Sequence, residues 1–159
     1  MRNSSKAAAK RRVQYGALPY RVSRGDRAEF MLVTSRETRR WIIPKGWPSK
    51  RIKDCKAAAR EARQEAGVKG KILREAIGTY RYIKRELGDG VLVEVRVFLL
   101  KVSKRCKRWP EKRERRRAWF DIEDAANRVS DPELSIIIIS MLQERDGDGG
   151  RPSHNTTPG

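Results

Sequence analysis

The chain has 159 residues, and its 38 lysines and arginines outnumber its 20 aspartates and glutamates. This length fits one domain with a hydrophobic core of its own. The formal net charge of +18 indicates a polyanionic partner, such as a nucleotide, an inositol polyphosphate or a nucleic acid. A charge excess that only keeps the protein in solution is the alternative.

The scarcity of histidine and cysteine excludes several classes of chemistry. His154 is the only histidine and lies in a polar tail, which argues against Ser-His-Asp, Cys-His and histidine-ligated zinc sites. Cys55 and Cys106 form neither a disulfide framework nor a metal-ligand cluster, so we expect a reducing cytoplasm. No apolar run approaches the roughly 20 residues of a membrane span, and the N-terminus lacks the apolar core of a secretory signal.

The first part of the chain predicts a basic arm followed by strands. Residues 1–12 have the composition of a mobile, disordered arm. Strands are predicted over residues 14–22 and 29–35, with a turn at Gly25 between them. Residues 41–44 predict a short extended segment, because each residue before a proline avoids the helical region.

A helix is predicted over residues 54–66, with Asp54 as N-cap and Gly67 just after the last turn. At 100° per residue this helix has three stripes. They are a face of small residues (Cys55, Ala59, Ala62, Ala66), a basic face (Lys53, Lys56, Arg60, Arg63) and an acidic stripe (Asp54, Ala58, Glu61, Glu65).

The acidic stripe brings two carboxylates together. Glu61 and Glu65 are four residues apart, so their like charges are neighbours on the helix. Their repulsion destabilises an isolated helix by about 0.2–0.5 kcal/mol. None of the helix's four cations lies three or four positions from either glutamate, so both acids are predicted to lack cationic partners. With Gln64 beside them, they could share a hard divalent cation. A solvated acidic stripe is the alternative.

The second half of the chain predicts a hairpin. Residues 71–84 and 91–102 have the pattern of long strands, joined by a turn at residues 88–90. Along the second strand, odd-numbered residues from Val91 to Leu99 are predicted to face one way, and even-numbered residues the other.

The C-terminal part predicts a basic connection and two helices. Residues 101–117 form the connection, and order resumes at residues 118–120. Asp121 is predicted to cap one helix, and Asp131 with Pro132 to open the last. Residues 146–159 have the composition of a disordered tail.

The segment around the predicted helix resembles a known motif. The motif is the Nudix box, GX5EX7REUXEEXGU, in which U is a bulky apolar residue. Four groups fall in its register without a gap: Gly46, Arg60-Glu61-Ala62, Gln64-Glu65 and Gly67-Val68. Three positions depart from it, since Ile52 replaces the first glutamate, Ala62 replaces a bulky residue and Gln64 replaces the first of the paired glutamates. Gln64 offers a neutral oxygen without a negative charge, which implies a weaker or rearranged metal site.

The resemblance implies the fold and a branch of the superfamily. The implied fold is a Nudix-type α/β/α sandwich with a mixed β-sheet over residues 13–145. Within the superfamily the chain is most similar to the diphosphoinositol polyphosphate phosphohydrolases and their bacterial relatives. That similarity is carried by residues 40–44 and 65–70, by Trp109 with Glu111, and by residues 119–125.

The resemblance also implies the chemistry and its residues. The implied reaction is hydrolysis of a phosphoanhydride bond, in an inositol pyrophosphate or a nucleoside diphosphate-linked substrate such as a diadenosine polyphosphate. The cofactor would be Mg²⁺, with Mn²⁺ as the alternative. Glu61, Glu65, Gln64 and the carbonyl of Gly46 would bind it, either glutamate would serve as base, and Arg60 would orient a glutamate. The cations expected near substrate phosphates are Lys45, Arg21, Arg40 and Arg36.

Other functions remain open from the sequence. One is a Nudix-fold protein with weakened catalysis that binds RNA or another polyanion through its basic surface, as the altered box and the net charge suggest. Another is hydrolysis of nucleoside triphosphates or of capped or triphosphorylated RNA. A basic structural or ribosome-associated protein is a third.

Overall fold

The computed structural model describes residues 12–85 and 90–149, with side chains through residue 142. The predicted arm before residue 12, most of the turn at 88–90, and the end of the predicted tail with His154 lie outside these residues. None of the described helices is long and apolar enough to cross a bilayer.

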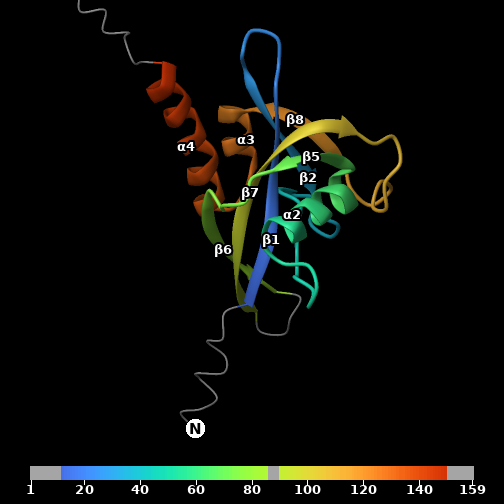
Figure 1. Ribbon diagram of the computed structural model, residues 1–159. Helices are drawn as coiled ribbons and strands as arrows, with labels where there is room; N and C mark the ends of the chain where they lie inside the picture. The colour runs from blue at the N-terminus through green and yellow to red at the C-terminus, as the bar shows by residue number, and fades with distance from the viewer. Residues whose placement is uncertain (1–11, 86–89, 150–159) are drawn as a thin grey trace, which may run out of the picture.

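The described strands form one mixed sheet of eight strands (Figure 1). Its centre is the parallel pair β1 and β7, in register from Arg12 opposite Val93 to Tyr20 opposite Lys101. The other strand pairs are antiparallel. The strand order is β3-β2-β1-β7-β5. Three further strands join this order by pairing: β4 with β1, β6 with β7 and β8 with β2. The strands are β1 Arg12–Val22, β2 Ala28–Thr34, β3 Trp41–Ile42, β4 Lys45–Gly46, β5 Val68–Ile72, β6 Gly78–Lys84, β7 Val91–Arg105 and β8 Arg117–Asp121.

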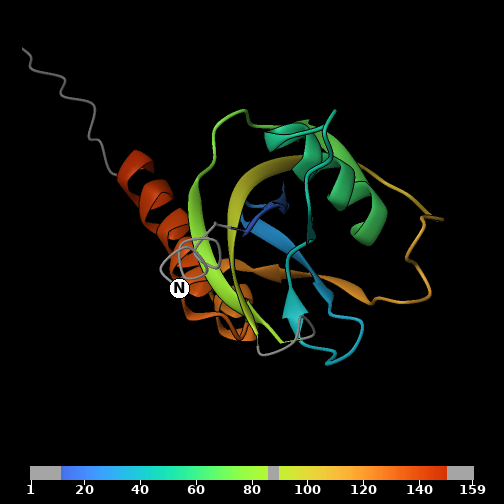
Figure 2. The ribbon, with the colours of Figure 1, turned by 90° about the horizontal axis from the view of Figure 1, so that it is seen from below.

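Helices cover both faces of this sheet (Figure 2). One face packs on α2 (Asp54–Glu61) and the π-helical turn η1 (Ala62–Ala66), and the other packs on α3 (Ile122–Arg128) and α4 (Pro132–Gly149). Two separate apolar cores result, one on each side. The predicted α/β/α sandwich is therefore confirmed.

The central strand β7 serves both cores through its alternation. Val93, Val95 and Val97 are buried in the core beneath α3 and α4, while Phe98 and Leu100 are buried in the core beneath α2. Successive side chains of a strand point to opposite faces, as the sequence predicted here.

The structure differs from the predicted elements in the sheet and at the C-terminus. The single strand predicted over 71–84 is wrong, because β5 and β6 pair with different halves of β7 and the chain leaves the sheet between Ile72 and Gly78. The predicted tail starts too early, because α4 continues to Gly149. The capping of α3 is as predicted, since the Asp121 carboxylate accepts a hydrogen bond from the Asp124 amide (2.7 Å).

The pairing of β5 with β7 contains a bulge. Lys69 pairs with Lys104 while Gly70 pairs with Val102, so Ser103 is an extra residue on β7. The Ser103 hydroxyl donates to the carbonyl of Lys69 (3.4 Å). A Cβ atom on Gly70 would overlap the backbone carbonyl oxygen of Lys101, so only glycine fits this close approach.

We expect Gly70→Ala to lower the free energy of unfolding by about 1–3 kcal/mol, because the added methyl group must displace backbone atoms. Urea unfolding measures this loss. Lys71→Ala, on the exposed side of the same strand, is the matched control and should change stability by no more than about 0.5 kcal/mol. Equal stability of the two variants would contradict the close approach at Gly70.

Candidate active site

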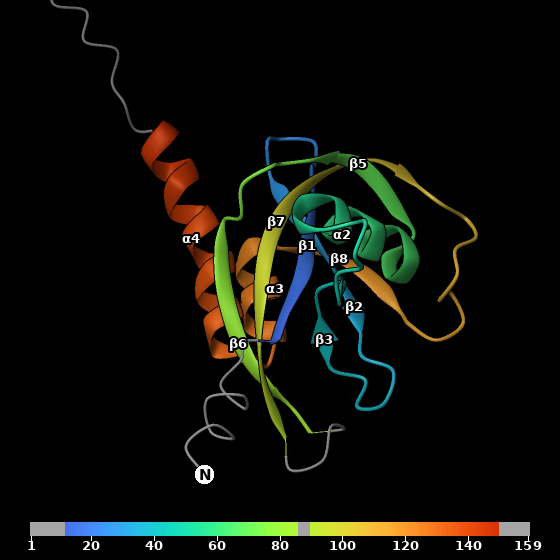
Figure 3. The same ribbon diagram turned by 60° about the horizontal axis from the view of Figure 1, so that its bottom comes forward.

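A cleft of about 1160 Å³ opens beside β4 and the C-terminal half of the box helix, as we call α2 together with η1. Figure 3 shows α2 next to β1 on one face of the sheet. The walls of the cleft come from segments distant in sequence: the loop after β2, the end of β6, the connection before β8 and the start of α4. Both acidic and basic side chains line it. The acids are Glu37, Glu61, Glu65, Glu111, Glu114 and Asp131, and the cations are Arg36, Arg40, Lys45, Arg81, Lys84, Arg85 and Arg115.

The predicted helix is not regular. α2 begins at Asp54, with Lys53 in the N-cap position and no side-chain capping bond, so the prediction of Asp54 as N-cap is wrong. The last turn is π-helical, and Gly67 ends it with a φ of 64°. The wider turn changes the direction of Glu65 relative to a regular helix, and single π turns are common at functional sites.

Glu65 is buried at the back of the cleft, with 3% of its surface exposed. Its Oε1 accepts a hydrogen bond from the backbone amide of Lys45 (3.1 Å), and its Oε2 lies 3.3 Å from an Arg115 nitrogen. Burial raises the pKa of Glu65 to about 7, against the opposing effects of Arg115 and Lys45. The acidic stripe is therefore not the solvated face that was the alternative interpretation.

Glu61 lies against the backbone of β4. A Cβ atom on Gly46 would overlap the Glu61 carboxyl group, so the missing side chain is what lets this carboxylate reach the strand. An Arg60 nitrogen lies 3.6 Å from Glu61 Oε1, and Arg60 also donates to the carbonyl of Trp47 (3.4 Å). Burial raises the pKa of Glu61, Glu111 adds to the rise, and Arg60 opposes it.

The connection between β7 and β8 closes the end of the box helix. The Trp109 indole donates to the carbonyl of Glu65 (3.2 Å), and the Glu111 amide donates to the carbonyl of Gln64 (3.2 Å). Arg117 donates to the carbonyl of Ala66 (2.8 Å). These bonds satisfy carbonyls that a helix end leaves free.

The same connection brings Arg115 into the site. Its guanidinium is 9% exposed, contacts Glu65 and Glu111 (3.1 Å to Oε1), and donates to the carbonyl of Thr34 (3.1 Å). The prediction that Glu61 and Glu65 lack cationic partners is therefore wrong. Arg115 was not predicted from the sequence, since nothing separates it from the other arginines of a basic run.

Lys45 lies deep in the cleft beside a tyrosine. Its ammonium is 4.8 Å from the ring centroid of Tyr82, whose hydroxyl donates to the Gln14 side chain (2.8 Å). Burial lowers the pKa of Lys45, while Glu65 and Asp131 oppose the fall. Burial raises the pKa of Asp131, and the positive charge of Lys45 opposes this rise. Neither Tyr82 nor Asp131 was predicted from the sequence to be a site residue.

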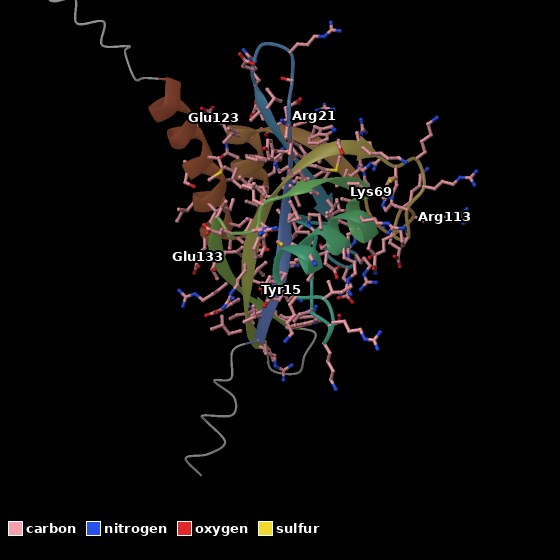
Figure 4. The ribbon with its side chains drawn as sticks, viewed as in Figure 1. Tyr15, Arg21, Lys69, Arg113, Glu123 and Glu133 are labelled. Atoms are coloured by element: carbon pink, nitrogen blue, oxygen red, sulfur yellow. The ribbon has the colours of Figure 1, made fainter. Side chains whose placement is uncertain are left out.

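The other predicted cations separate into two groups. Arg36 and Arg40 line the cleft, and Arg36 lies 3.9 Å from both Glu111 and Glu114. Arg21 does not line it. Arg21 lies toward the β1–β2 hairpin, where it pairs with Glu29 (3.1 Å) and stacks 4.2 Å from the Trp119 ring centroid (Figure 4). Arg21 pairs with Glu29 of β2, near the C-terminal end of β1. Lys45 pairs with Gly16, in the first half of β1.

Two of the three departures from the box, Ile52 and Gln64, have different environments. Ile52, in place of an acid, packs against the apolar core beneath α2. Gln64 is exposed and lines the cleft with its neighbours Glu61 and Glu65. The first substitution therefore serves packing, whereas the second removes a charge from the cleft.

Known proteins are similar to this chain in sequence. No protein-family model matches the chain. Nudix hydrolase 12, mitochondrial, of Arabidopsis thaliana is 31% identical over 131 residues, which cover 72% of this chain and 64% of that protein. Diphosphoinositol polyphosphate phosphohydrolase 3-alpha of Mus musculus is 37% identical over 111 residues, which cover 68% of this chain and 63% of that protein. The chain belongs to the Nudix hydrolase superfamily.

Solved structures of the Nudix superfamily share the fold. A binary complex of the Caenorhabditis elegans Ap4A hydrolase superposes with a TM-score of 0.64 at 21% identity, covering 85% of this chain and 98% of that one. A Nudix hydrolase from Nitrosomonas europaea superposes at 0.62 and 19% identity, covering 94% and 97%. The chain spans less than two thirds of Nudix hydrolase 12. Several Arabidopsis relatives are named mitochondrial, so the cytoplasmic location stays a prediction.

The oxygen atoms around Gly46 fit a hard divalent cation. The donor set is two carboxylates, the Gln64 amide oxygen and the Gly46 carbonyl, and Gly46 leaves room for a carboxylate against the strand. Each carboxylate accepts at about four positions, so the bonds to Lys45 and Arg115 leave Glu65 acceptors free. Among the described residues no group of three or more acids, histidines or cysteines gathers at metal-binding distances. Few protein ligands and several retained waters are typical of Mg²⁺.

We expect the stability of the metal-free protein to fall as the pH rises from about 4.5 to about 7. The pKa of Glu65 is raised above its ordinary 4.5, so its contribution to stability is complete below that value and is lost as the pH passes about 7. Urea unfolding in EDTA at several pH values measures this. Glu61 and Asp131 shift the same way, so the comparison is with Glu65→Gln, whose stability should fall less. Parallel curves would contradict the assignment.

Proposed function

We propose that this chain is a metal-dependent hydrolase of phosphoanhydride bonds. The observation that carries the proposal is the pair Glu61 and Glu65, which lie beside the backbone of Gly46 within a cleft lined by cations. The superfamily membership and the relatives named as hydrolases support it.

Different residues of the chain would bind the metal ion, accept a proton and orient the carboxylates. Glu61, Glu65, Gln64 and the Gly46 carbonyl would hold the ion, which when bound polarises a phosphoryl oxygen and acidifies water. Glu61 or Glu65 receives the proton of the attacking water. Arg60 and Arg115 act on these carboxylates, because charge-assisted hydrogen bonds fix where a carboxylate points.

The cations of the cleft would bind the phosphates of the substrate. The backbone amide of Lys45 is bonded to Glu65, and the desolvated ammonium of Lys45 is a strong partner for a phosphate oxygen. Arg36 and Arg40 line the same cleft from the loop between β2 and β3. Together they neutralise charge along a chain of phosphates rather than at a single one.

The size and lining of the cleft favour an extended substrate. Its volume of about 1160 Å³ exceeds the roughly 300–1000 Å³ of common ligand pockets. Trp47 lines the wall with 39% of its surface exposed, so it can stack on a base or a sugar ring. We therefore propose a dinucleoside polyphosphate or an inositol pyrophosphate, the classes named for the Caenorhabditis elegans and mouse relatives.

A panel of phosphoanhydrides tests this proposal directly. Diadenosine polyphosphates, inositol pyrophosphates and nucleoside triphosphates are assayed for phosphate release with Mg²⁺, Mn²⁺ or EDTA. We expect turnover of at least one class with metal and none with EDTA. The altered box residues Ile52 and Gln64 favour a second candidate, a Nudix-fold protein with weakened catalysis that binds RNA or another polyanion. Salt-sensitive RNA binding without phosphate release would establish that one instead.

Glu61→Gln and Glu65→Gln should each lower kcat by about 100-fold or more with Mg²⁺, since each removes a carboxylate from the proposed ion and base. Steady-state kinetics on the best substrate measures this. Glu75→Gln, an exposed carboxylate outside the cleft, is the matched control and should behave as the wild type. Wild-type turnover in both cleft variants would overturn the mechanism.

Gln64→Glu should tighten Mg²⁺ binding by about tenfold, because it restores an acid beside Glu61 and Glu65. Isothermal titration calorimetry with the metal alone gives the affinity. Asn127→Asp adds the same charge on the exposed surface of α3 and should leave the affinity unchanged. No difference between the two variants would place Gln64 outside the ion's surroundings.

A further inference from the structure

Four lysines gather on one face of the sheet. They lie in the β5–β7 strand pair, whose paired residues include no aspartate or glutamate. Lys71 is directly opposite Lys101, and Lys69 is directly opposite Lys104, across the β5–β7 pair. All four side chains are exposed. We call Lys69, Lys71, Lys101 and Lys104 the lysine face.

The bulge in β7 is what puts these lysines together. Lys101 and Lys104 are three residues apart, so in a regular strand they would point to opposite faces. The extra residue Ser103 shifts the register, and both lysines then pair with residues of β5 that are two apart. The close approach of Gly70 to the Lys101 carbonyl allows this arrangement.

The lysine face is opposite the face that carries the box helix. Val68 and Leu100 are buried in the core beneath α2, so their sequence neighbours Lys69 and Lys101 point the other way. None of the four lysines lines the cleft.

This arrangement is costly unless an anion binds there. Like charges directly opposite each other destabilise a strand pair. Among the described residues, none of the four lysines has an ion pair with an acid that would offset this repulsion. Among the described residues, no other pair of neighbouring strands places two like-charged pairs so close together.

We propose that the lysine face binds the phosphodiester backbone of a single nucleic-acid strand. Lysines two apart on a strand are about 6.6 Å apart and those on paired strands about 5 Å, so the face presents closely spaced charges to a repeating polyanion. Isolated anions would engage only one or two of them. The four lysines supply backbone contacts and no reading of base sequence.

An aromatic ring beside the lysines favours a single strand over a duplex. Tyr20 is the partner of Lys101 on β1, which places it on the same face, and its side chain is partly exposed. Unpaired bases stack on such rings, whereas the bases of a duplex are already stacked. The ligand chemistry is shared by RNA and DNA, and the experiment separates them.

The test measures binding of fluorescein-labelled oligo(U) and oligo(dT), each about 12 nucleotides long, by anisotropy at several salt concentrations. The variant replaces all four lysines by glutamine. We expect the slope of log K against log salt to flatten by about 3, since each lysine contributes about 0.7 with a single strand. At low salt we expect at least a tenfold loss of affinity, and the relative loss for the two oligomers identifies the preferred strand.

The matched control replaces Lys50, Lys53, Lys56 and Arg63 by glutamine, which removes the same charge from the box-helix side of the molecule. Its slope should stay near that of the wild type. An equal loss in both variants would overturn the proposal in favour of general charge attraction, as would equal binding of a poly-glutamate peptide or of a duplex. The lysine-face variant should keep its Tm, or raise it, and should retain phosphoanhydride turnover. These two readouts separate this inference from the proposed function.

Discussion

The buried ion pair between Glu65 and Arg115 is the interaction on which the candidate site depends. Both side chains are less than a tenth exposed, so each compensates a charge that burial would otherwise penalise heavily. The pair also joins the π-helical turn to a connection that starts about 40 residues later in the chain. Because Arg115 bonds to Glu111 and Thr34 as well, one guanidinium holds a helix end, a loop and a strand edge around the cleft.

The parallel pair of β1 and β7 explains why the cleft forms at this place. β1 supplies the edge on which Lys45 and Gly46 pair, and β7 supplies the hairpin that brings Tyr82 beside Lys45. The box helix lies across both strands. A rigid sheet therefore sets the distance between the carboxylates on the helix and the cations on the surrounding loops.

The excess positive charge is not spread evenly over the molecule. In the cleft, Arg60 and Arg115 contact the carboxylates of Glu61 and Glu65, and further basic groups are left for phosphates. On the lysine face no described acid compensates the charge. The two surfaces point to anions of different shape, a compact polyphosphate in the first and an extended backbone on the second. Net charge alone could not distinguish these two sites.

Local pattern determined much of this protein from the sequence alone. The gap-free box register identified the helix that carries Glu61 and Glu65, and two-residue alternation identified the faces of β7, because both depend on neighbouring residues. Tertiary structure decided the rest. Arg115 and Asp131 reach the cleft through contacts across the fold, Arg21 is held at the other end of β1, and Ser103 changes the face of Lys104. The positions of these residues depend on strand register and on the course of the loops. Both are set by packing between segments that are far apart in the sequence, so a local sequence pattern does not contain them.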